Sequence, residues 1–142
     1  MTIEVNNRQK AVRLSAASVR RVLSAALEGD GRKVDLSVAL VGDDEIAALN
    51  ERYLGRHGLT DVLAFPYDCE GDVLVGEIVA NAELAEREAA GRAHGADDEL
   101  MLYLVHGLLH LLGYDDHDPA DARRMRRREQ EILRGAGRAV EF

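Results

Sequence analysis

The sequence predicts an α/β fold of the α+β type, built as a single domain over residues 1–142. Segments with the two-residue period of strands are interspersed with segments of helical period. A chain of 142 residues suits one domain with one hydrophobic core. One helical segment, residues 97–112, is apolar on nearly every side, which is typical of a central helix. We therefore expect a small mixed four-stranded sheet that packs with about five helices, one of them central and apolar.

The first half of the chain predicts two strands and two helices. Residues 3–5 alternate as a short strand, and residues 16–28 carry apolar side chains at helical spacing. Residues 34–40 alternate between apolar and polar, which favours a strand with one buried face. Asp43 is suited to cap the next helix, and residues 55–60 then form a loop.

The second half predicts a hairpin and three helices. Residues 62–65, followed by Pro66, predict a strand that ends at an edge or a bend, and residues 73–80 form its partner after a turn. Gly76 marks a bulge or a close approach within that second strand. The three helices are expected at residues 82–93, capped by Asn81, at residues 97–112, and at residues 119–134, capped by Asp118.

Composition sets limits on the compartment and on the partners. The single cysteine, Cys69, excludes an internal disulfide, and no stretch reaches the roughly 18 apolar residues of a membrane helix. Because no signal peptide is visible at the N-terminus, we expect a cytoplasmic protein with no membrane contact. The net charge of −8 argues against a general nucleic-acid binder, since phosphate contacts need Lys and Arg.

The segment with the clearest chemistry is residues 106–117, HGLLHLLGYDDH. His106 and His110 are four residues apart, so in a helix both imidazoles project from one face. Gly113 then ends the helix, and His117 follows closely enough to close a three-ligand site. Three protein ligands and one open position are typical of catalytic zinc, which activates a water molecule near neutral pH. The central helix is thus expected to carry the metal ligands, for one Zn²⁺ per chain, although a three-His site also suits nickel, copper or iron.

An alternative is that His106 and His110 are core histidines satisfied by hydrogen bonds. Two unpaired buried imidazoles would cost about 1–3 kcal/mol each, and the third histidine favours the metal. Zinc proteases carry a Glu as general base directly after the first His, where this chain has Gly107, so peptide hydrolysis is disfavoured. We expect Gly107 to leave room for a bulky substrate beside the metal. His94, in a polar turn, is expected to be exposed.

Three segments together resemble the YbeY family of bacterial rRNA-maturation endoribonucleases. They are HGLLHLLGYD followed by a His, LNERY (49–53) with TDVLAFP (60–66), and LVGEI (74–78) before a helix. The resemblance implies zinc held by three His and cleavage of single-stranded RNA. It also implies a role at the 3′ end of small-subunit rRNA and in ribosome quality control, with the small ribosomal subunit and assembly factors as partners.

The sequence departs from the family pattern in two places. The family reads Gly-Tyr-Asp-His, whereas here Asp116 is inserted before His117, so either His117 or Asp116 is the third ligand. The family commonly has an Arg linked to activity at the position of Leu54. Arg56, two residues on, is either its replacement or a solvated loop residue.

The predicted catalytic residues are therefore Arg56, His106 and His110, and the predicted metal ligands are His106, His110 and His117. Arg56, His57 and Asp61 are the predicted substrate-binding residues, although for Asp61 the alternative of a helix- or strand-end cap is slightly favoured. The rival function is a zinc-stabilised ribosome assembly factor with little intrinsic catalysis. The sequence leaves the oligomeric state open.

Overall fold

The computed structural model of the chain describes residues 2–140, and for residues 68–70 it describes the backbone alone. The side chain of Cys69 therefore lies outside the described part. The elements, in chain order, are β1 (Thr2–Asn7), α1 (Ala16–Asp30), β2 (Lys33–Val41), α2 (Asp43–Leu54), β3 (Val62–Glu70), β4 (Val73–Asn81), α3 (Ala82–Ala89), α4 (Ala96–Leu111) and α5 (Pro119–Gly135). The predicted α+β fold, with a four-stranded mixed sheet and five helices among the described residues, is confirmed.

The sheet has the strand order β1-β2-β4-β3. β1 pairs with β2 and β2 with β4 in parallel, whereas β3 and β4 form an antiparallel hairpin. β3 is consequently an edge strand. This explains why β3 continues past Pro66 to Glu70 instead of ending at the proline, because alternate N–H groups of an edge strand face away from the sheet.

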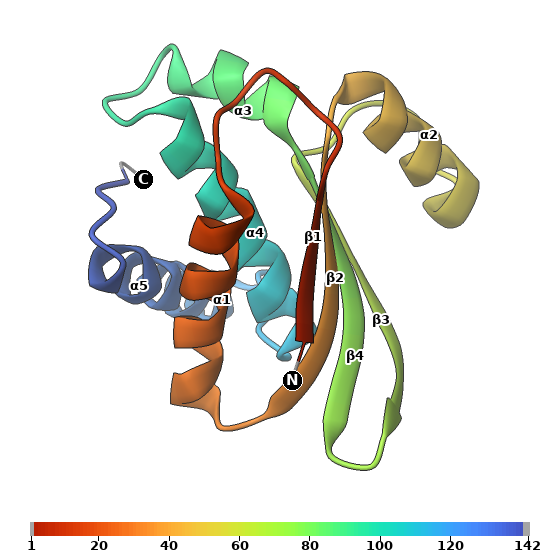
Figure 1. Cartoon of the computed structure of the whole chain (residues 1–142), viewed down its shortest axis with the longest axis vertical. Coiled ribbons are helices and arrows are strands. Elements are labelled where there is room, and N and C mark those ends of the chain that lie inside the picture. Colours follow the sequence, from red (N-terminus) through yellow and green to blue (C-terminus); the bar gives the residue numbers. More distant parts are fainter. Residues whose placement is uncertain (1, 141–142) are drawn as a thin grey trace.

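Helices cover both faces of the sheet (Figure 1). α1, α4 and α5 lie on one side, over the larger core, and α2 lies on the other side. Each face of the sheet has its own hydrophobic core, and successive strand residues point into the two cores alternately. Val38 and Ile78 belong to the larger core, and Ala39 and Val79 belong to the smaller one. None of the helices within residues 2–140 is long and apolar enough to cross a membrane.

α4 is the central helix, as its all-round apolar sequence predicts. It contacts β3 and β4 as well as α1, α3 and α5. Two glycines let it lie close to the sheet. A Cβ on Gly107 would lie 2.9 Å from Ile78 Cγ2, and one on Gly76 would lie 2.9 Å from Leu111 Cδ1. The predicted close approach at Gly76 is thus confirmed.

The expectation for Gly107 was wrong. Gly107 is buried against the sheet, between side chains of β3 and β4, and leaves no free space for a substrate. Its role is to bring the helix backbone close to the strands. This close packing fixes the position of His106 and His110 relative to β3.

The helix starts follow the predicted caps at α3 and α5. Asn81 accepts hydrogen bonds from the backbone N–H groups of Glu83 and Leu84, and Asp118 accepts one from Asp121. α2 differs, since Asp43 is its first residue and the side chain of Glu83 accepts from the Asp43 N–H at 2.7 Å. α3 ends at Ala89, earlier than the predicted residue 93, in a short turn before α4.

Candidate metal centre and the adjoining cleft

Two imidazoles of α4 point at one place in space. Nε2 of His106 lies 3.1 Å from Nε2 of His110, and the two rings stand nearly perpendicular, at 85°. Both rings are half-buried. The four-residue spacing in a helix produces this arrangement, because residues i and i+4 lie one above the other on the same face.

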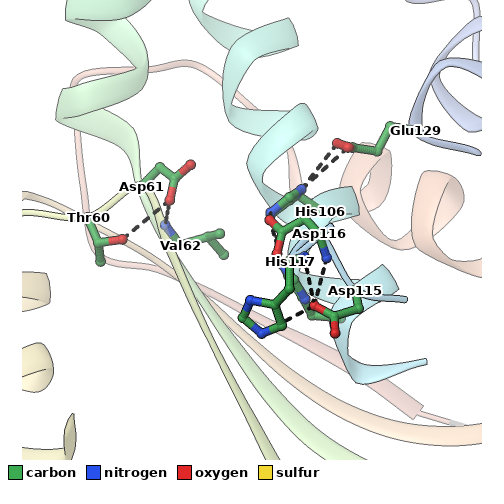
Figure 2. Close-up of polar contacts among 9 residues, drawn as sticks. Thr60, Asp61, Val62, His106, Asp115, Asp116, His117 and Glu129 are labelled. Atoms are coloured by element: carbon green, nitrogen blue, oxygen red, sulfur yellow. Dashed lines mark hydrogen bonds and ion pairs between the residues drawn. The ribbon is translucent and has the colours of Figure 1, made fainter. Parts of the chain in front are cut away.

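The segment after α4 brings a carboxylate to the same place (Figure 2). Gly113, at φ +102°, turns the chain back after the helix. Oδ2 of Asp116 then lies 3.7 Å from Nε2 of both histidines. The side chain of His117 is 88% exposed, with its Nε2 3.3 Å from Oδ1 of Asp115. The structure therefore groups Asp116, rather than His117, with the histidine pair.

Asp115 holds this turn in place. Its Oδ1 accepts hydrogen bonds from the backbone N–H groups of Asp116 at 2.7 Å and of His117 at 3.2 Å. Residues 115–117 also form a second group of possible metal donors, all of them exposed, that shares Asp116 with the first. The half-buried group of His106, His110 and Asp116 is the better enclosed of the two.

The half-buried donors fit a divalent metal ion. Tetrahedral zinc with ligands at about 2.0–2.1 Å places two ligand atoms about 3.3–3.4 Å apart. The observed separations of 3.1 and 3.7 Å differ from that value by a few tenths of an ångström. Two imidazole nitrogens and one carboxylate oxygen are also a donor set that zinc accepts.

Glu129 of α5 supports the first histidine from behind. Its buried carboxylate lies 3.3 Å from Nδ1 of His106, on the side of the ring away from His110. Burial lowers the pKa of His106, but the hydrogen bond and charge of Glu129 outweigh it, with smaller contributions from Asp61 and Asp116, so the pKa is raised overall. A proton on Nδ1 leaves Nε2 as the metal-facing nitrogen, which is the usual arrangement around metal-bound histidines.

A cleft of about 700 Å³ adjoins this centre. It lies between α3, α4, α5 and the start of β3, and its lining is mixed apolar and charged. The lining residues are Leu59, Thr60, Asp61, Leu84, Glu88, Arg92, Glu99, Leu102, Tyr103, His106, Arg126 and Glu129. His106 is therefore both a member of the candidate centre and part of the cleft wall.

Asp61 stands across the cleft from His106 (Figure 2). Its Oδ1 accepts hydrogen bonds from the Val62 N–H at 2.7 Å and from the Thr60 hydroxyl at 3.3 Å. Asp61 thus caps the start of β3 and also lines the cleft, and its contact with substrate stays a prediction.

Comparison with known proteins decides the family. A family model described as Endoribonuclease YbeY matches residues 4–137. The chain belongs to the YbeY family. It is thus a member of a family of RNA-cleaving hydrolases.

Similar proteins agree with this membership. Endoribonuclease YbeY of Anaeromyxobacter sp. (strain Fw109-5) is 41% identical over 96% of this chain and 73% of the relative. Endoribonuclease YbeY of Thermodesulfovibrio yellowstonii is 35% identical over 94% of this chain and 96% of the relative. The solution structure of TM1509 from Thermotoga maritima superimposes with a TM-score of 0.64 at 26% identity, covering 95% of this chain and 89% of that one.

Arg56 and His57 are not brought to the cleft of this YbeY-family chain. Both are exposed on the loop between α2 and β3, and neither belongs to the described lining of the cleft. Nδ1 of His57 lies 3.9 Å from a carboxylate oxygen of Glu51 on α2. Any contact of these two residues with substrate, which stays a prediction, would therefore lie outside this cleft.

His94 was predicted to be exposed, and this was wrong. Its side chain is buried, and its Nε2 lies 2.6 Å from Oε1 of Glu99 on α4. Arg92 also contacts Glu99, at 3.2 Å. A carboxylate on the buried side of the central helix needs such partners, since a buried unpaired charge is strongly destabilising.

The sequence analysis missed Glu129 as a functional residue. It lies on the buried stripe of α5 together with Met125, Ile132 and Leu133. A single acidic residue on the apolar stripe of an amphipathic helix was the available signal, because buried carboxylates have partners. Its partner, His106, could not be predicted from the sequence, since the two residues are 23 positions apart.

Proposed function

We propose that this chain is a single-strand-specific, zinc-dependent endoribonuclease that matures ribosomal RNA. Its substrate is the 3′ end of the small-subunit rRNA, and it also acts in ribosome quality control. The partners are single-stranded rRNA, the small ribosomal subunit and assembly factors, in the cytoplasm. Family membership supports RNA cleavage. The observation that carries the metal is the convergence of His106, His110 and Asp116, of which His106 also lines the cleft.

One Zn²⁺ per chain would be held by His106, His110 and a third ligand from residues 115–117. The separation of 3.7 Å from both rings supports Asp116 as that ligand in the arrangement described above. His117, the family-like choice, follows directly and would need the exposed turn to rearrange. When bound, zinc supplies a Lewis acid for a phosphoryl oxygen and a water nucleophile near neutral pH.

The protein residues have separate tasks in this proposal. His106 and His110 bind the metal, and Glu129 orients His106 by accepting its Nδ1 proton in a hydrogen bond. Asp61, opposite His106, would help to position the scissile strand in the cleft. Arg56 and His57 are proposed to contact the RNA farther along, on the exposed loop before β3.

The experiment is the cleavage of a single-stranded RNA that carries the small-subunit 3′ end. The same RNA annealed to its complement is the substrate control, and His110→Ala, purified identically, is the enzyme control. We expect cleavage of the single strand by the wild-type protein alone. Equal cleavage by both proteins would reveal a contaminating nuclease and contradict the proposal. Absence of cleavage by both, with zinc needed for folding, would instead support the ribosome assembly factor.

A further inference from the structure

We propose that Arg126 of α5 binds a phosphate group of the RNA strand beside the candidate metal centre. This inference rests on the proposed function and names a substrate-binding residue that neither sequence spacing nor family membership assigns. The residue is an arginine in the cleft wall, which also contains His106.

The position of Arg126 follows from its helix. Arg126 precedes Glu129 by three residues, so the two side chains lie on one face of α5, one turn apart. Glu129 reaches Nδ1 of His106 at 3.3 Å, which fixes that face toward the candidate centre. Arg126, although exposed, accordingly belongs to the lining of the cleft.

The neighbouring arginines of α5 have other roles. Arg128 contacts Glu131 at 3.2 Å and the carbonyl oxygen of Ala26 at 3.4 Å, so it faces α1. Arg127 is exposed and does not belong to the described lining of the cleft. The arginine run of residues 126–128 is therefore divided among three directions.

The cations of the cleft lie on different walls, beside carboxylates of the same lining. Among the described residues, the lining contains two cations, Arg92 and Arg126. Arg92 is engaged by Glu99 at 3.2 Å and by Glu88 at 3.7 Å, in the part of the cleft that α3 covers. Arg126 comes from α5, the helix whose Glu129 contacts His106, so a phosphate group bound there would lie on the side of the candidate centre.

The chemistry of the strand matches this arrangement. A guanidinium presents a planar fork that binds two oxygens of one phosphate group, and its charge offsets the negative charge that develops during cleavage. Leu59, Leu84 and Leu102 supply apolar wall for an adjoining base. In a protein of net charge −8, a phosphate contact at Arg126 would help to hold the strand in the cleft.

The test compares Arg126→Ala and Arg126→Lys with the matched control Arg127→Ala. Zinc content, melting temperature, kcat/KM on the single-stranded RNA, and the salt dependence of RNA binding are measured for each. We expect Arg126→Ala to lower kcat/KM by about 10- to 100-fold. The slope of log affinity against log salt should fall by about 1, with partial recovery in Arg126→Lys and no change in Arg127→Ala.

Equal behaviour of Arg126→Ala and Arg127→Ala would overturn the inference. A fall in zinc content or melting temperature with Arg126→Ala would also overturn it, because Arg126 would then act through the fold of the centre. If the wild-type protein binds but does not cleave RNA, the proposed function fails. The salt slope still decides the role of Arg126 in that case.

Discussion

The carboxylate of Glu129 lies 3.3 Å from Nδ1 of His106, so a residue of the last helix orients a residue of the central helix. This contact crosses from α5 to α4 and leaves the opposite ring nitrogen facing His110 and Asp116. It connects the fold to the candidate chemistry, because the apolar stripe of α5 that packs on the core also carries the supporting carboxylate.

Loss of this carboxylate should weaken metal binding. We expect Glu129→Gln to lower zinc affinity by about 10- to 100-fold, since the amide removes the negative charge that makes His106 a stronger ligand. Competition with a chromophoric chelator measures the affinity. Glu131→Gln, on the same helix but exposed, is the control and should leave the affinity unchanged. An unchanged affinity in Glu129→Gln would exclude the supporting role.

The third ligand can be assigned by two single substitutions. Asp116→Ala should reduce the zinc bound per chain, because Asp116 lies 3.7 Å from both histidines. His117→Ala should leave zinc content close to that of the wild-type protein, since its side chain is 88% exposed. Zinc content after dialysis, measured by atomic emission, decides between them. The reverse result would assign His117 and require the turn at residues 115–117 to rearrange on metal binding.

Gly107 should resist even the smallest side chain. A Cβ there would lie 2.9 Å from Ile78 Cγ2 and 3.0 Å from Val62 Cγ2, so α4 or the strands must shift. We expect Gly107→Ala to lower the free energy of unfolding by about 1–2 kcal/mol, because overpacking outweighs the roughly 1 kcal/mol gain in helix propensity.

Gly135→Ala provides the matched control, since a Cβ at this α5 position meets nothing within 4 Å. It should leave stability unchanged or raise it slightly. Urea unfolding of both variants gives the comparison, and a stabilised Gly107→Ala protein would contradict the close packing of α4 on the sheet.

The stability should depend on pH through Asp43. Hydrogen bonds from Arg87 and then from Asn81 hold the pKa of Asp43 below its ordinary value of 3.8. Because the folded-state pKa is depressed, the ionised carboxylate stabilises the fold above 3.8, and this contribution is lost as the pH falls through the lowered value.

Asp43→Asn should therefore lower the urea midpoint at neutral pH, and the difference from the wild-type protein should shrink below pH 3.8. Asp44→Asn is the control, as it removes a carboxylate from the same helical turn but leaves the Arg87 pair in place. A difference that stays constant at low pH would show that Asp43 acts through its shape alone.

Most of the fold was predictable because apolar periodicity and local caps are short-range signals. The all-round apolar pattern of residues 97–112 indicated the central helix, and Asn81 and Asp118 indicated two helix starts. The end of β3 was mispredicted at Pro66, since strand order decides whether a proline is tolerated, and strand order is not local.

The candidate centre was predictable in its helical half. The spacing of His106 and His110 places both rings on one face whatever the rest of the fold does. The positions of Asp116 and His117 depend on the turn after Gly113, and Glu129 depends on how α5 packs on α4. The same limit explains His94 and Gly107, because His94 is buried against Glu99 of α4 and Gly107 is buried against the sheet.

The most direct test is the return of RNA cleavage when zinc is restored to the metal-free protein. Removal of zinc by a chelator should reduce cleavage of the single-stranded RNA to background. One equivalent of zinc should restore it in the wild-type protein but not in His106→Ala or His110→Ala. Cleavage that survives zinc removal, or that both variants retain, would contradict a metal-dependent ribonuclease built on these two histidines.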